Sequence, residues 1–111
     1  MRISRWVAAL ASVLLVAACS SEPNSDTQIV VNNTSGETIF RVFYSDCSDP
    51  QWGDDRLEDD EVIETGNERE FNVDEGCYDI RADFDLNGLD QVTILNQQID
   101  EGEVFEWSPA H

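Results

Sequence analysis

Strict alternation of apolar and polar residues is the feature that most restricts the fold of this chain. In the segment CYDIRADF, residues 77–84, apolar side chains occupy every second position after the cysteine. A strand directs successive side chains to opposite faces, so this pattern predicts a strand with one buried face. The predicted inward residues are Tyr78, Ile80, Ala82 and Phe84, and the predicted outward residues are Asp79, Arg81 and Asp83.

Five further segments alternate in the same way or are rich in β-branched and aromatic residues. They are Gln28–Asn32, Glu37–Ser45, Glu68–Asp74, Gln91–Leu95 and Glu103–Trp107. No segment shows a helical stripe, although residues 54–61 are compatible with one acidic turn. Short strands separated by turn residues predict an all-β fold, a small antiparallel β-sandwich of six to seven strands.

The turn at Leu86-Asn87-Gly88 allows a sharper prediction of strand register. A two-residue Asn-Gly loop would direct the apolar residues of the following strand toward solvent. A three-residue loop with Gly88 in the left-handed region buries them instead, and we expect this second register. Its expected pairs are Ile80 with Ile94 and Ala82 with Val92.

The N-terminus has the composition of an export signal. Two arginines precede the apolar run WVAALASVLLVAA at residues 6–18, which is too short to span a bilayer and typical of a signal peptide over residues 1–18. The residues Val16–Cys19 resemble the lipobox of bacterial lipoproteins. This resemblance implies cleavage before Cys19, lipid on its sulfur, a lipidated tether over residues 19–26 and a domain over residues 27–111. The alternative is an ordinary cleaved signal in which Cys19 is incidental.

The lipobox resemblance also predicts the membrane in which the protein is anchored. Lipoproteins retained in the inner membrane have aspartate after the lipidated cysteine, whereas this chain has Ser20. The resemblance therefore implies an outer-membrane lipoprotein that faces the periplasm or the outside.

The charge balance excludes one class of partner. The chain has 24 acidic residues against 6 basic ones, a formal net charge of −18. All of the basic residues are arginine, and removal of residues 1–18 discards two of them and no acid, which makes the charge −20. Such a chain cannot neutralise a row of phosphates, so we expect no nucleic-acid partner. The acid excess is compatible either with a salt-adapted source or with an acidic recognition site.

The two remaining cysteines, Cys47 and Cys77, predict a disulfide. Export places the chain in an oxidising compartment, and lipid on Cys19 leaves an even pair. A reactive pair is the alternative, but the spacing is not C-x-x-C and the neighbouring acids raise thiol pKa values.

Residues 83–88 match the first half of an EF-hand loop, D-x-D-x-N-G. The complete loop needs a bidentate glutamate at its twelfth position, which is Ile94 here. Asp83, Asp85 and Asn87 are therefore a candidate calcium site, with a strand entering a turn as the alternative interpretation. The acidic residues 54–55 and 58–61 could gather divalent ions loosely or form a solvated loop.

A second resemblance covers about Ile29 to Ile94. The residues that carry it are Tyr44, Cys47, the segment WGDDRL at 52–57, Phe71 and the segment GCYDIRA at 76–82. Their order resembles a small domain of bacterial secreted proteins and lipoproteins. The resemblance implies a β-sandwich and a Cys47–Cys77 pairing, and it implies no activity.

Four residues of this motif receive structural predictions. Trp52 is expected to cap one open end of the sandwich, with Gly53 allowing a tight turn and Leu57 as an apolar plug. Arg81 is expected to pair with a carboxylate on a neighbouring strand. The alternative interpretation of the loop makes Trp52, Gly53, Asp54 and Asp55 a contact surface for a partner.

Catalysis lacks the usual residue types. The single histidine is the last residue, His111, and the chain has no lysine to activate a serine or cysteine. We expect no enzyme and no cofactor. The sequence instead favours a lipid-anchored structural or interaction module of the cell envelope that recognises a protein or a polysaccharide. The alternative is a calcium-dependent binding module that uses Asp83, Asp85 and Asn87.

Overall fold

The computed structural model describes residues 26–110 of the chain. The predicted signal peptide, Cys19 and His111 lie outside these residues. The strands are β1 (Gln28–Asn32), β2 (Arg41–Asp46), β3 (Glu68–Asn72), β4 (Gly76–Asp83), β5 (Gln91–Ile99) and β6 (Val104–Trp107). Within the described range there is no helix, so the expected acidic turn at 54–61 is not helical, and nothing there has the length and apolar character of a membrane-crossing helix.

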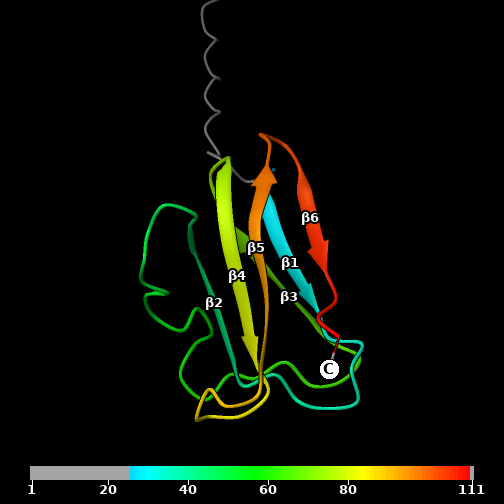
Figure 1. The fold of residues 1–111 in the computed structure, drawn as a ribbon. Helices are drawn as coiled ribbons and strands as arrows, with labels where there is room; N and C mark the ends of the chain where they lie inside the picture. The colour runs from blue at the N-terminus through cyan, green and yellow to red at the C-terminus, as the bar shows by residue number, and fades with distance from the viewer. Residues whose placement is uncertain (1–25, 111) are drawn as a thin grey trace, which may run out of the picture.

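The strands form two three-stranded sheets, in the orders β3-β1-β6 and β2-β4-β5 (Figure 1). This arrangement confirms the predicted all-β sandwich. Strand pairing is antiparallel with one exception, because β1 and β6 run parallel. The first and last strands, β1 and β6, therefore lie side by side in one sheet and run in the same direction.

The core lies between the two sheets. Ile29 and Val31 of β1 and Ile80 and Ala82 of β4, at alternate positions of the two central strands, are fully buried there, as the pattern of residues 77–84 predicts for β4. The core cluster comprises Ile29, Val31, Ile39, Val42, Leu57, Ile63, Phe71, Val73, Ile80, Ala82, Phe84 and Ile99. Full burial of a side chain of this size contributes about 1.5–3 kcal/mol relative to exposure, so this cluster supplies the main stabilising free energy.

The predicted register of β4 and β5 is confirmed. Ile80 pairs with Ile94 and Ala82 pairs with Val92, and Gly88 has a φ of +73°. The connection is longer than three residues, because strand pairing stops at Asp83 and residues 84–90 form a loop. A bulge opposite Asp79 then allows β5 to continue beyond the predicted end to Ile99.

The predicted disulfide joins Cys47 to Cys77, with their Cα atoms 5.4 Å apart. It links the segment after β2 to the start of β4. The two cysteines are 30 residues apart in sequence. In the chain-entropy model a loop of this length gives about 3.5 kcal/mol of stabilisation. That contribution offsets part of the repulsion among the many acidic side chains.

A buried asparagine organises the turn after β1. The side chain of Asn33 is fully buried, and its Nδ2 donates to the carbonyls of Glu37 and Ile63, both at 2.8 Å. Its Oδ1 accepts from the backbone N–H and the hydroxyl of Ser35. Because the amide group has partners at both ends, its burial costs little. This turn positions Ile39 for its isolated bridge with Ile63.

Candidate functional site

A buried carboxylate joins two arginines on the outer face of the β2-β4-β5 sheet. The side chain of Asp83 is fully buried, and its oxygens lie 2.8 Å from Nη2 of Arg41 and 2.7 Å from Nε of Arg81. Asp83 thus lies on the predicted outward face of the strand, but it is buried there and not exposed to solvent. Arg81 does pair with a carboxylate, but with one on its own strand, and the cross-strand partner of Asp83 is Arg41.

The loop 84–90 lies over these two arginines at Gly88. A Cβ atom at position 88 would be 2.8 Å from Nη2 of Arg81 and 3.1 Å from Nη2 of Arg41. The positive φ of Gly88 disfavours any side chain as well. Glycine is needed at position 88 both for the turn and for the close approach of the loop to the two arginines. The loop 84–90 therefore packs directly on the cluster of Arg41, Arg81 and Asp83.

A second loop covers the edge of β2. The backbone N–H of Val42 donates to Oδ1 of Asp55, and the carbonyl of Val42 accepts from the N–H of Arg56 at 2.7 Å. The Arg56 guanidinium donates to the carbonyl of Tyr44 and lies 4.2 Å from the centroid of its ring. These bonds close one edge of the sheet with the chain itself.

Trp52 covers the outer face of the same sheet, and not an open end of the sandwich as expected. Its ring is partly buried and lies 5.8 Å from Cζ of Arg81, which also lies 4.7 Å from the Phe43 ring. Gly53 has a φ of +80°, which confirms the predicted tight turn. The predicted plug, Leu57, is buried in the core.

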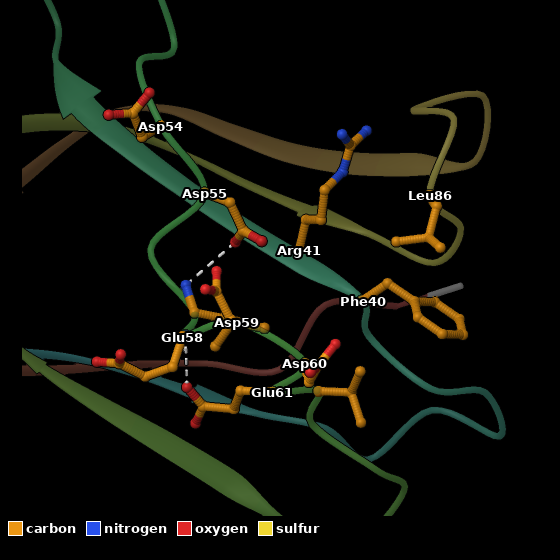
Figure 2. A pocket seen from close by; sticks show the side chains of 11 residues that line it. Phe40, Arg41, Asp54, Asp55, Glu58, Asp59, Asp60, Glu61 and Leu86 are labelled. Atoms are coloured by element: carbon orange, nitrogen blue, oxygen red, sulfur yellow. Dashed lines mark hydrogen bonds between the residues drawn. The ribbon is translucent and has the colours of Figure 1, made fainter.

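A hollow lies between the loop 54–62, the start of β2 and the loop 84–90 (Figure 2). Its volume is about 550 Å³. Apolar side chains line it from three separate segments, namely Phe40, Leu57, Val62 and Leu86. The polar lining consists of Arg41 and the acids Asp54, Asp55, Glu58, Asp59, Asp60 and Glu61. The hollow thus combines an apolar lining with six carboxylates at its rim.

Two of the six carboxylates hold the loop together. Oδ1 of Asp55 accepts from the N–H groups of Val42 and Leu57, and Oε1 of Glu61 accepts from the N–H of Glu58. Oε2 of Glu61 pairs with Arg69 at 2.8 Å. The bonds from Arg69 and from the Glu58 N–H lower the pKa of Glu61, so this side chain stays ionised under mildly acidic conditions.

The other four carboxylates have no partner within residues 26–110. They belong to Asp54, Glu58, Asp59 and Asp60. Asp60 has a φ of +65°, in the left-handed region that aspartate tolerates better than most residues. These groups are charged, accessible and uncommitted, so the rim can accept hydrogen bonds from a cationic ligand.

The two carboxylates of the candidate calcium site bond other groups of the chain. Asp83 is held by two guanidinium groups, and Oδ1 of Asp85 accepts from the N–H groups of Asn87, Gly88 and Leu89. A cation at Asp83 would meet two positive charges. Throughout residues 26–110 no group of three or more acidic, cysteine or histidine side chains is arranged to hold a metal ion.

The structure divides the predicted contact loop of Trp52, Gly53, Asp54 and Asp55. Asp54 and Asp55 line the large hollow, whereas Trp52 lines a smaller one beside Cys47 and Asp79. The apolar side of the large hollow was not predicted, because Phe40 and Leu86 are distant in sequence from the acidic loop. Leu86, a leucine within a turn and 66% exposed in the structure, is the one residue that could have indicated such a surface.

The hollow is lined by no serine, cysteine, histidine or lysine. Its chemistry is that of carboxylates, one guanidinium and apolar surface, which suits binding of a positively charged group with an apolar part.

Comparisons with known proteins identify no relative. No protein-family model matches the chain, and no match is found among curated proteins or among solved structures.

The close contact at Gly88 predicts a specific cost for a methyl group. We expect Gly88→Ala to lower the free energy of unfolding by about 2–3 kcal/mol. Left-handed backbone strain contributes part of this loss, and displacement of Arg81 and Arg41 from their buried carboxylate contributes the rest. Urea denaturation followed by circular dichroism measures the change.

Gly102→Ala is the matched control, since Gly102 has a φ of +83° and nothing lies within 4 Å of its added Cβ. This variant carries the strain alone, about 1 kcal/mol. Equal losses in the two variants would show that the arginines swing away freely and that Asp83 does not fix them.

Proposed function

We propose that this chain is a lipid-anchored protein of the bacterial outer membrane whose domain, residues 27–111, is a non-catalytic interaction module. The observation that carries the binding role is the hollow between residues 54–62, the start of β2 and Leu86. Apolar side chains line it, and four carboxylates without partners in the described residues stand around it.

The chemistry of the hollow favours a basic protein surface as the partner. An arginine or lysine of such a surface can bond the free carboxylates of Glu58, Asp59 and Asp60, while an adjacent apolar side chain contacts Phe40 and Leu86. The net charge of −18 attracts a basic partner from a distance and discourages acidic competitors. A neutral polysaccharide would leave the carboxylates unpaired, so it suits this site less well.

The sequence of the N-terminus supports the anchor. Lipid on Cys19 would attach the chain to the membrane, and the polar, proline-bearing segment SSEPNSD at residues 20–26 would act as a flexible tether. The strongly acidic domain is repelled by anionic lipid headgroups. It is therefore held away from the bilayer with its hollow accessible to other envelope proteins.

The hollow predicts binding of a short cationic peptide with an apolar centre. The probe is N-acetyl-Arg-Leu-Arg-amide, added to the ¹⁵N-labelled full-length protein in detergent. We expect saturable amide shifts confined to residues 40–41, 54–62 and 86, with a Kd of about 1 mM at low salt. The double variant D59N/D60N should bind about tenfold more weakly, because it removes two rim charges at about 0.7 kcal/mol each.

The matched control is E70Q/E101Q, which removes the same number of charges from exposed positions outside the hollow. It should leave the affinity within about twofold of the wild type. If both double variants weaken binding equally, the attraction is that of the whole acidic surface and the hollow is not a binding site.

The anchor makes a separate prediction. Mass spectrometry of the protein from bacterial membranes should find an N-terminal Cys19 whose sulfur carries a diacylglyceryl group. Cys19→Ser should abolish this modification, and the variant should retain residues 1–18 because cleavage of a lipobox follows lipid transfer. Recovery of an unlipidated mature chain from the medium would contradict the anchor while leaving the hollow untouched.

A further inference from the structure

The four sheet edges of this domain are protected to very different degrees. The β2 edge is closed by bonds from Asp55 and Arg56. The β3 edge carries charge, with the sequence EREFN, and β6 is only four residues long. β5 is the fourth edge, and its nine residues, QVTILNQQI, contain no charge and no proline. Charged, short or covered edges resist pairing with another chain, whereas a long uncharged edge permits it.

The ladder between β4 and β5 shows which groups of β5 face outward. The N–H of Phe84 donates to the carbonyl of Asp90, so hydrogen-bonded pairs alternate from there to Ala82–Val92 and Ile80–Ile94. The intervening residues, Gln91 and Thr93, direct their N–H and C=O groups away from β4. Within residues 26–110 no strand or loop pairs with these main-chain groups.

The bulge limits the open edge to its first half. The backbone N–H of Asn96 donates to Oδ1 of Asp79, and Asn96 has a φ of +58°. Bulges disrupt the regular ladder of an edge strand, so the stretch available for pairing is Gln91–Ile94. Leu89, which is 84% exposed, precedes this stretch and offers an apolar contact at its end.

The charges around the stretch define what can pair with it. Asp90 precedes the stretch, and the stretch itself is uncharged. A second copy of this chain would bring a further net charge of −18 to the same place. A segment with an uncharged centre and basic flanks is complementary in both respects.

We propose that the β5 edge at Gln91–Ile94 is a second docking site, which binds an extended segment of a partner protein as an added β-strand. The segment has about four uncharged residues, with arginine or lysine on each side. Main-chain bonds to Gln91 and Thr93 supply the pairing, and the net negative charge of the chain favours the basic flanks. This site lies apart from the hollow and does not depend on it.

The test uses the peptide N-acetyl-Arg-Val-Thr-Val-Thr-Arg-amide and the ¹⁵N-labelled full-length protein in detergent. At saturation, amide hydrogen exchange at Gln91 and Thr93 should slow by about tenfold or more, because both N–H groups gain carbonyl partners. The same peptide N-methylated at its central residues cannot form the ladder and should leave both exchange rates unchanged, and a peptide with aspartate flanks should also fail.

A pair of variants separates main-chain pairing from side-chain contact. Thr93→Pro removes only an outward N–H, which an edge strand tolerates, and it should abolish the response at Gln91. Thr93→Ala keeps that N–H and should respond like the wild type. The comparison of the two peptides on the wild-type protein stands even if Thr93→Pro does not fold.

Two results would overturn the proposal. One is unchanged exchange at Gln91 and Thr93 with saturating peptide, including the case in which amide shifts appear only at residues 40–41, 54–62 and 86. The other is an equal effect of the N-methylated peptide, which would show contact without strand pairing. Neither result bears on the hollow, whose test uses a peptide too short to add a strand.

Discussion

The two ion pairs of the buried Asp83 carboxylate are the interactions on which the proposed binding surfaces depend. The carboxylate joins Arg41 of β2 to Arg81 of β4, and the loop 84–90 rests on the pair at Gly88. Arg41 and Leu86 form one wall of the hollow, so the position of the loop 84–90 determines that wall. The same loop leads into β5 and so determines where its open edge begins. Removal of one partner of a buried ion pair costs about 3–5 kcal/mol. The cost is smaller here, because Arg41 remains partly exposed.

The arginines of residues 26–110 bond groups of the chain itself, so they do not neutralise the rim carboxylates of the hollow. Residues 26–110 contain four arginines, and each lies over an aromatic ring, at distances from 4.2 to 5.5 Å for the nearest ring. Each also bonds a carboxylate or a backbone carbonyl of the chain. Arg41 and Arg81 thus cover Phe43 on the outer face of the β2-β4-β5 sheet, whereas Arg56 and Arg69 cover Tyr44 and Phe71, rings that pack with the core. The four arginines leave the rim carboxylates of the hollow available to a partner.

The sequence determines the parts of this fold that depend on local periodicity. The β4 strand and its pairing with β5 are predictable, because a shift of one residue would expose Ile94 and Val92. The disulfide between Cys47 and Cys77 is predictable from the even pair of cysteines in an exported chain. The parallel pairing of β1 with β6 is not predictable in the same way, since it depends on how the last strand crosses between sheets. Periodicity places Asp83 on the outward face but does not predict its burial, because the loop that covers it has no periodic pattern.

The site was only partly accessible to sequence reasoning, for a related reason. Asp54 and Asp55 stand out as an acidic run, and both line the hollow. Phe40 and Leu86 complete it from segments that no local pattern connects to that run. A loop that returns across a sheet brings such residues together, and its path is set by bonds such as those from Asp55 and Arg56 to Val42. Those long-range bonds leave no periodic trace in the sequence.

The central claim is that the hollow with six carboxylates attracts a positively charged group more strongly than the other acidic parts of the surface do. Paramagnetic relaxation of backbone amides by a trimethylammonium nitroxide, corrected with a neutral nitroxide of the same size, measures this directly. The account predicts the largest enhancement at residues 40–41, 54–62 and 86. Equal enhancement at the acidic residues 74, 75 and 101, which surround a different hollow, would contradict it.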